Sequence, residues 1–523
     1  MSVRTTILVV AGAALAAWGG AAGSGPVEAS RSGLTHRTPR LSPDYSGIVL
    51  PPNIAPLNFA VKEAGTRFHV RFYSTTGTPI EVSGRQPAVV IPPRPWRELL
   101  RANAGQPLCL EIRTCDSQNQ WTRYDTVTNT IAREEIDGYL VYRLIKPLYN
   151  LYRDVGIYQR NLETDEQTEV LHNRSFDRGC VNCHTFPGRD PDNMILHIRS
   201  KPYANAMLLS RSNEVVKVAT AVGYTTWHPS GRLVVFSANK FSQFFHTLGE
   251  TREVYDAASD LCVYHLDSNS LVRPAPISQA NYLETWPSWS PDGRFLYFCR
   301  ALKSSIEQYR QIRYDLVRIS YDIEHDTWGE PETMVAARDT GLSAAQPRVS
   351  PDGRFLLFCL SDYGNFPIYQ ASCDLYVMDV ATRKSRRLEI NSDRSDSWHC
   401  WSGNSRWVVF SSKRRDGLFA RPYFSYVDQQ GVFHKPFLLP QKDPAFYDSF
   451  VKTFNVPELV RGPVKVRQQA LVRAIVAPRA VLNPKSVPAS PPPTPGVHAS
   501  QDTAEDSDEP YMDPHSIPAR TRK

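Results

Sequence analysis

The segment Cys180-Val-Asn-Cys183-His184 places two thiols two residues apart, with an imidazole directly after the second. This is the spacing of covalent haem attachment. Two thiols on a tight turn meet the two vinyl groups on one edge of a porphyrin, and the adjacent histidine then lies under the iron as an axial ligand. The motif predicts one covalent haem c, held by Cys180, Cys183 and His184.

Three other roles of such a thiol pair are less well supported. A redox-active Cys-x-x-Cys usually begins a helix beside a βαβ pattern, which the sequence lacks. A zinc site needs a fourth ligand and normally a second paired motif, which is also lacking. A plain disulfide between Cys180 and Cys183 is the third alternative. The other seven cysteines are odd in number and do not indicate a disulfide-dense scaffold.

The strand-like segment 194–199 offers candidates for the second axial ligand of the iron. By strand alternation Met194 lies on one face, whereas His197 and Arg199 lie on the other, so Met194 and His197 cannot both meet the iron. We favour His197, because it brings with it Arg199, a suitable partner for a haem propionate. Met194 is the alternative and would raise the reduction potential. His172, Met207 and an open iron position also remain, as does core packing for each of these side chains.

An internal repeat over about residues 155–440 predicts the elements that position the motif. Its turn arginines stand at positions 232, 294, 354 and 406. Each copy reads as a short strand, a Pro-Asp-Gly-type hairpin turn and a buried strand, and two more strands follow. Four antiparallel strands make one propeller blade. The clearest copies are Trp289-Ser-Pro-Asp-Gly-Arg-Phe-Leu-Tyr-Phe and Val349-Ser-Pro-Asp-Gly-Arg-Phe-Leu-Leu-Phe.

The spacing predicts a six-bladed β-propeller over residues 155–470, with five or seven blades as alternatives. Five blades begin near positions 176, 224, 285, 346 and 398. Segments 156–162 and 166–171 supply outer strands of a sixth blade, which a segment near 454–466 would complete. Several side chains recur before the inner turns, where the mouth of the channel would gather them, and we favour structural roles for them over a metal or substrate site. These are Trp227, His228, Trp286, Trp398 and His399.

The remaining segments differ from the repeat in composition. Residues 41–145 contain short alternating runs between Gly and Pro turns, which predict a small β-sandwich, with one helix at 95–101. Residues 1–29 read as a signal peptide, with an uncleaved anchor as the alternative. Residues 474–523 are rich in proline and poor in aromatics, so we expect a disordered tail.

Composition sets the class of protein. The chain has 523 residues, of which 41% are hydrophobic and 11% aromatic, enough for a sizeable core. Its net charge of +7 is too small and too dispersed to indicate nucleic-acid binding. Apart from residues 1–29, no stretch is apolar over the length of a membrane span. We therefore expect a periplasmic protein with no stable membrane span once the signal is cleaved.

Particular segments also resemble a known family. The Ser-Pro-Asp-Gly-Arg copies, with the segment 374–379, resemble TolB-type, WD-repeat-like β-propeller repeats. More closely, the chain resembles exported TolB-like proteins of Bacteroidetes-type bacteria that carry a haem motif, over about residues 48–464. The resemblance implies a propeller and a haem at Cys180, Cys183 and His184, but no reaction. It rests on Cys180-Val-Asn-Cys-His-Thr-Phe, Trp227-His-Pro-Ser-Gly-Arg, Ser361-Asp-Tyr-Gly-Asn-Phe, Asn404-Ser-Arg-Trp-Val-Val-Phe-Ser-Ser and Lys442-Asp-Pro-Ala-Phe-Tyr-Asp-Ser-Phe.

These features lead to one preferred function and two alternatives. We expect a monohaem c-type protein that transfers electrons in the periplasm, where a redox protein would be its partner. A TolB-like interaction scaffold with a structural or sensory haem is the first alternative, with a protein partner on a propeller face. A haem enzyme such as a peroxidase is the second, and the sequence favours a non-enzyme.

Overall fold

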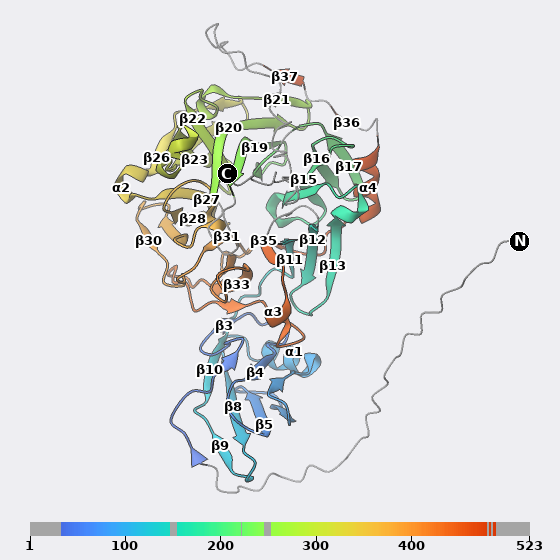
Figure 1. Ribbon diagram of the computed structural model, residues 1–523, viewed down its shortest axis with the longest axis vertical. Helices are drawn as coiled ribbons and strands as arrows, with labels where there is room; N and C mark the ends of the chain where they lie inside the picture. The colour runs from blue at the N-terminus through green and yellow to red at the C-terminus, as the bar shows by residue number, and fades with distance from the viewer. Residues whose placement is uncertain are drawn as a thin grey trace, which may run out of the picture.

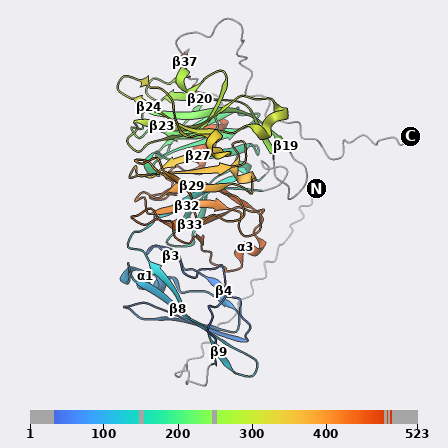
Figure 2. The same ribbon diagram turned by 90° about the vertical axis from the view of Figure 1, so that its left-hand side faces the viewer.

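The computed structural model describes residues 33–146, 154–220, 222–244, 253–477, 481–482 and 485–487. The expected signal peptide, residues 1–29, lies outside the described residues. Two sheet systems make up the fold. In Figure 1 the N-terminal sheets, in blue, lie below a ring of blades, next to β33 and α3; Figure 2 shows the same arrangement from the side.

The N-terminal part contains a seven-stranded and a three-stranded sheet. Strand β5 alternates buried and more exposed residues, so one face packs inward, as the sequence pattern predicts. Helix α1 (Pro93–Ala102) begins with prolines in its first turn and buries Trp96, Leu99 and Leu100. The larger sheet contains β1 (Gly33–Leu34), β3 (Val49–Leu50), β5 (Arg67–Tyr73), β6 (Ile80–Gly84), β8 (Pro107–Cys115), β9 (Trp121–Arg123) and β10 (Val127–Ile131), and the smaller one β2 (Leu41–Ser42), β4 (Phe59–Val61) and β7 (Ala88–Val89).

Six sheets form the propeller among the described residues, which confirms the predicted six-bladed all-β fold. The first three blades along the chain are β14 (Cys180–Thr185), β15 (Asn193–Arg199), β16 (Ala206–Arg211), β17 (Glu214–Val218); β18 (Thr225–Trp227), β19 (Leu233–Phe244), β20 (Glu253–His265), β21 (Ser270–Val272); and β22 (Tyr282–Trp289), β23 (Phe295–Leu302), β24 (Asp315–Asp322), β25 (Thr327–Trp328) with β26 (Glu332–Val335).

The next two blades are β27 (Ser343–Val349), β28 (Phe355–Ser361), β29 (Asp374–Asp379), β30 (Ser385–Arg387) and β31 (Asp396–Trp401), β32 (Trp407–Ser412), β33 (Arg421–Tyr426), β34 (Phe437–Leu438). Short helices connect several strands: α2 (Ala337–Thr340), α3 (Phe446–Ser449) and the 3-10 turns η2 (Asn173–Ser175), η3 (Pro187–Arg189), η4 (Ala275–Ile277), η5 (Ile306–Gln311) and η6 (Pro367–Tyr369).

The sixth blade closes the ring with strands from both ends of the propeller sequence. It contains β13 (Gln167–His172), β12 (Gly156–Asn161), β11 (Tyr139–Ile145) and β35 (Thr453–Val460), in that order. The C-terminal strand therefore completes this blade, as expected. The placement of residues 139–145 in the N-terminal sandwich was wrong, because β11 pairs along its length with β12 and β35 and thus belongs to the propeller.

The expected disordered tail also begins too early. Helix α4 (Gln468–Val476) buries Leu471, Ala474 and Ile475 against the propeller. Two short strands beyond it, β36 (Val481–Leu482) and β37 (Lys485–Val487), pair in parallel with β17 and β21. The helix forms because its apolar side chains find a buried surface, which composition alone does not reveal. The other residues after 477 lie outside the described chain.

The repeated hairpin turn has one geometry in successive blades. Gly293 and Gly353 take φ values of 74° and 75°, a left-handed conformation that glycine adopts without strain. In the divergent blade Ser405 takes the same conformation, with φ of 60°. Here Asn404 Nδ2 donates to the Glu135 carbonyl oxygen at 2.6 Å. The departure from Pro-Asp-Gly therefore coincides with the contact between this blade and the segment leading from the N-terminal sheets.

Candidate functional site

A bulge recurs in the innermost strand of most blades and directs side chains into the central channel. Strand pairing shifts register within β22, β27, β31 and β35. The residue at each bulge, Trp286, Gln346, Trp398 or Val456, has a φ between 48° and 57°. Such values are uncommon for residues other than glycine and mark local strain, which collects at functional sites.

The Cys-x-x-Cys-His motif occupies this same bulge in its own blade. It lies on β14, an edge strand whose pairing with β15 shifts between Val181 and His184. Asn182 and Cys183 therefore stand where Trp286 and Pro287 stand two blades later. The motif is thus part of the channel wall, and its last residue, His184, follows the bulge directly.

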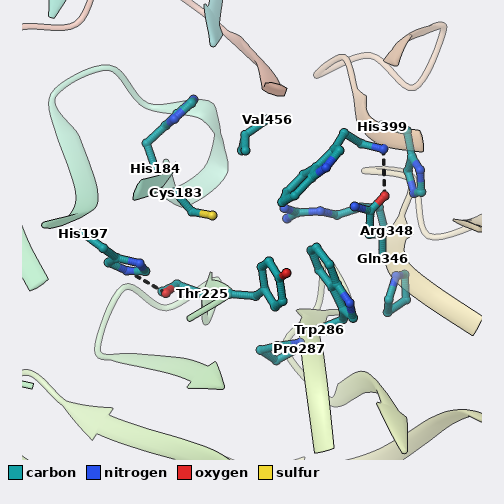
Figure 3. A pocket seen from close by; sticks show the side chains of 13 residues that line it. Cys183, His184, His197, Thr225, Trp286, Pro287, Gln346, Arg348, His399 and Val456 are labelled. Carbon is teal, nitrogen blue, oxygen red and sulfur yellow. Dashed lines mark hydrogen bonds between the residues drawn. The ribbon is translucent and has the colours of Figure 1, made fainter. Parts of the chain in front are cut away.

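One cavity in the channel, which we call the histidine cavity, contains both candidate histidine ligands. Its volume is about 30 Å³. Figure 3 shows Cys183, His184 and His197 on one side and Trp286, Arg348 and His399 on the other. His197 Nε2 lies 2.9 Å from the hydroxyl oxygen of Thr225.

Five buried nitrogen atoms on the wall of the histidine cavity have no hydrogen bond of good geometry among the described residues, although the backbone of Val141 lies close enough to His184, and that of Gly223 to His197, to raise their pKa values slightly. They are Nδ1 and Nε2 of His184, Nδ1 of His197, Nε2 of Gln346 and Nε1 of Trp398. Buried polar groups in native proteins are almost always paired, and each exception calls for an explanation. A ligand with acceptor atoms or a metal centre would satisfy several of these groups at once.

The motif side chains are uncharged where they lie. Burial, and next the positive charge of Arg143, lowers the pKa of His184 to about 3. Burial, and next Arg199, lowers the pKa of His197 to about 3 as well. Burial raises the pKa of both thiols, Cys180 and Cys183, and neither forms a disulfide. A neutral imidazole is the form that ligates iron.

The alternative ligands point elsewhere. Met194 lies in a blade core with Leu196 and Ile198, and Met207 is buried in the next core. Both ring nitrogens of His172 are engaged, Nε2 with Asp154 at 3.0 Å and Nδ1 as acceptor from the Arg174 N–H at 3.2 Å. Strand alternation therefore separates Met194 from His197 as the sequence predicts.

Of the residues predicted at the channel mouth, only some reach it. Trp286, Trp398 and His399 line the histidine cavity. His228 does not, because its Nδ1 lies 2.8 Å from Ser230 Oγ and its Nε2 3.1 Å from the Gly293 carbonyl oxygen. Trp227 packs in a blade core. The structural interpretation therefore fits Trp227 and His228.

A second space in the channel, the arginine cavity, has a volume of about 90 Å³. Arg143 and Arg199 line it together with Cys180 and Cys183. Tyr224 and Trp398 border both cavities. Of the residues on these walls, Arg199 was predicted from the sequence, whereas Arg143, Tyr224 and Gln346 were not. A signal existed for the last two: each stands seven residues before a turn glycine, Gly231 or Gly353, as Trp286 does before Gly293.

The donor set at β14 fits a covalent haem. Two free buried thiols and a neutral histidine with both ring nitrogens unpaired stand together on the channel wall. The space is smaller than ligand pockets usually are, about 300–1,000 Å³. The aromatic rings of Tyr224, Trp286 and Trp398 would have to move aside, because they occupy the volume between the cavities.

Known proteins were compared with the chain by sequence and by structure. No family model and no curated protein matches the chain. One similar solved structure is an oligogalacturonate lyase from Vibrio parahaemolyticus, with 14% identity over 71% of this chain and 100% of that chain and a TM-score of 0.31. Another is a putative 6-phosphogluconolactonase from Bacteroides uniformis, with 12% identity over 74% of this chain and 99% of that chain and a TM-score of 0.33. Kuenenia stuttgartiensis hydrazine synthase is similar over 48% of this chain and 64% of that chain, with 12% identity and a TM-score of 0.28.

The expected electron-transfer cytochrome is contradicted. The described residues contain no group of three or more His, Cys, Asp or Glu side chains placed to hold a metal ion. The physical reason lies at His197. Thr225 already engages Nε2 of His197, so the residue expected to be the second axial ligand is not free at that nitrogen. In the described chain no helix is long and apolar enough to cross a membrane.

Proposed function

We propose that the protein binds a small molecule in its propeller channel, and that a haem attached to Cys180 and Cys183 is the resident cofactor there. The observation that carries the proposal is the convergence of five unpaired buried nitrogen atoms on the histidine cavity, beside a free thiol pair. His184 would be the protein's ligand to the iron. When bound, such a group supplies an iron centre whose remaining face can take a small ligand.

The resemblance to exported TolB-like haem-motif proteins supports the same proposal, and export would bring the chain to the compartment where haem is attached. The bulge on β14 turns Cys183 and His184 toward the channel. The inner strands β22, β27 and β35 around them are largely buried. The proposed role of these strands is to hold the motif and to keep bulk water from the site.

The test is to produce the full chain in a host that attaches haem to exported proteins. We expect the intact mass and the absorption spectrum to show one covalent haem per chain. Cys180→Ser combined with Cys183→Ser abolishes attachment, whereas the control Cys109→Ser, a half-buried thiol in the N-terminal sheets, leaves it unchanged. His184→Ala keeps the covalent bond but alters the spectrum. Wild-type protein free of haem under these conditions would overturn the cofactor assignment.

A further inference from the structure

The arginine cavity carries two positive charges, and the described residues of its wall supply no carboxylate to balance them. Arg143, from β11, and Arg199, from β15, both line it. Neither Asp nor Glu is among the described residues of its wall. By contrast, Arg348 in the histidine cavity has Glu458 at 3.6 Å. Of the arginines that line the two cavities, only Arg348 has an ion pair with a carboxylate of the described chain.

The two guanidinium groups have donors to spare. Arg143 Nη1 donates to Asn182 Oδ1 at 2.7 Å, but its Nε is buried without a partner. The guanidinium group of Arg199 has no hydrogen bond or ion pair with any described residue, whereas its backbone pairs with Cys180 across the sheet. A guanidinium presents five N–H donors in a planar fork that matches a carboxylate.

We propose that the arginine cavity is a carboxylate-binding site formed by Arg143 and Arg199. An unpaired charge in a partly buried, apolar setting is costly, and a carboxylate offsets the cost through charge-assisted hydrogen bonds. The rest of the wall favours an apolar remainder, since Phe241, Phe366 and Ile368 contribute to it. This inference rests on the proposed channel site but does not require that haem be attached.

The size of the cavity limits the ligand. Its volume of about 90 Å³ is below the roughly 150 Å³ that admits a benzene ring in an engineered protein cavity. A carboxylate with two or three carbon atoms therefore matches the space as packed. Two sources share this chemistry: the carboxylate arms of the haem itself, and a free short-chain acid.

The experiment compares propionate with propionamide, which has the same shape and no charge. Binding is measured by titration calorimetry and by the shift in thermal unfolding midpoint on the full chain, in carboxylate-free buffer. We expect propionate to bind and propionamide not to bind. Arg143→Gln and Arg199→Gln each weaken propionate binding about tenfold or more, since a hydrogen bond to a charged group contributes about 1.5–3 kcal/mol. Arg85→Gln, an exposed arginine in the N-terminal sheets, serves as the control.

Haem-free and haem-loaded protein distinguish the two sources. Binding by the haem-free form alone means that the arms of the haem occupy the arginines; binding by both forms means that the site takes a free acid. Equal responses to propionate and propionamide, or full affinity in both arginine variants, would overturn the inference. Misfolding is checked independently, because loss of an unpaired charge leaves the unfolding midpoint of ligand-free Arg199→Gln no lower than that of wild type. Haem content, read from the spectrum, reports separately on the proposed cofactor.

Discussion

The rings of Tyr224 and Trp286 stack in the channel with their centroids 3.3 Å apart and their planes inclined by 15°. Trp398 packs against this pair, 5.0 Å from Trp286 and 5.9 Å from Tyr224. Since Tyr224 and Trp398 border both cavities, the three rings separate the histidine cavity from the arginine cavity. Cys183 also borders both cavities, and we expect the stack to limit access to its sulfur.

Removal of one ring should therefore expose Cys183. In haem-free protein, we expect Trp286→Ala to raise the rate of Cys183 alkylation by iodoacetamide about tenfold or more, equivalent to about 1.4 kcal/mol in the free energy of access. Peptide mass spectrometry measures the rate. Cys262, in a blade core away from the channel, is the control within the same molecule. An unchanged Cys183 rate would mean that the stack does not restrict access.

Strain at the bulges can be measured at Val456. A left-handed conformation costs a β-branched residue roughly 1–2 kcal/mol, and proline at the next position disfavours helical backbone further. We expect Val456→Gly to be more stable than Val456→Ala by about 1 kcal/mol. The control is Val460, which lies on the same strand but does not have a positive φ. There we expect Val460→Ala to be more stable than Val460→Gly by roughly 0.5–1 kcal/mol. Denaturant unfolding measures the free energy of unfolding of all four variants. If Ala were more stable than Gly at both positions, Val456 would not be strained.

A buried carboxyl makes stability depend on pH. Burial raises the pKa of Glu284 to about 7, and its Oε2 has no partner among the described groups. The folded protein thus holds this proton to a higher pH than the unfolded chain, so between about pH 4.5 and 7 its contribution to stability falls as pH rises. Glu284→Gln removes this loss, and its stability relative to wild type should increase across that window by on the order of 2 kcal/mol.

Urea unfolding at several pH values measures the Glu284 effect. The exposed Glu324→Gln is the matched control and should show a difference from wild type that does not vary with pH. A Glu284→Gln difference equally independent of pH would show that Glu284 is ionised in the folded protein throughout.

The channel histidines should remain neutral in mild acid. Burial holds the pKa of His184 and His197 at about 3, whereas hydrogen bonding to Asp322 raises the pKa of exposed His325 above 6.5. In haem-free protein, imidazole resonances of His184 and His197 should not shift between pH 8 and 5 by NMR, while those of His325 do. Since the unfolded chain takes up these protons below about pH 6.5, the two histidines weaken the fold as pH falls from there toward 3. Titration of His184 near pH 6.5 would contradict its burial.

The blades were predictable because turn glycines recur at fixed distances from apolar strands, so local pattern and global fold agree. The sequence did not predict that residues 139–145 belong to the propeller. Their pattern suits a sandwich strand and a blade strand equally, and the strand that decides between them, β35, lies far away in the sequence. The motif at Cys180 was identified by spacing alone. Arg143 could not be identified in this way, since nothing in the sequence near a single arginine on a strand indicates that it lines a cavity together with residues of other blades.

Ring closure by β35 has a consequence for the order of synthesis. The strand that completes the channel wall beside β11 leaves the ribosome long after Cys183 does, because it stands at residues 453–460. Until then the N-terminal blades can fold, but the last segment of the wall is missing, and the thiol pair faces an open gap. A chain in which β35 has not yet docked, in whichever compartment it folds, would therefore leave the motif open to loading, and docking of the C-terminal strand would close it.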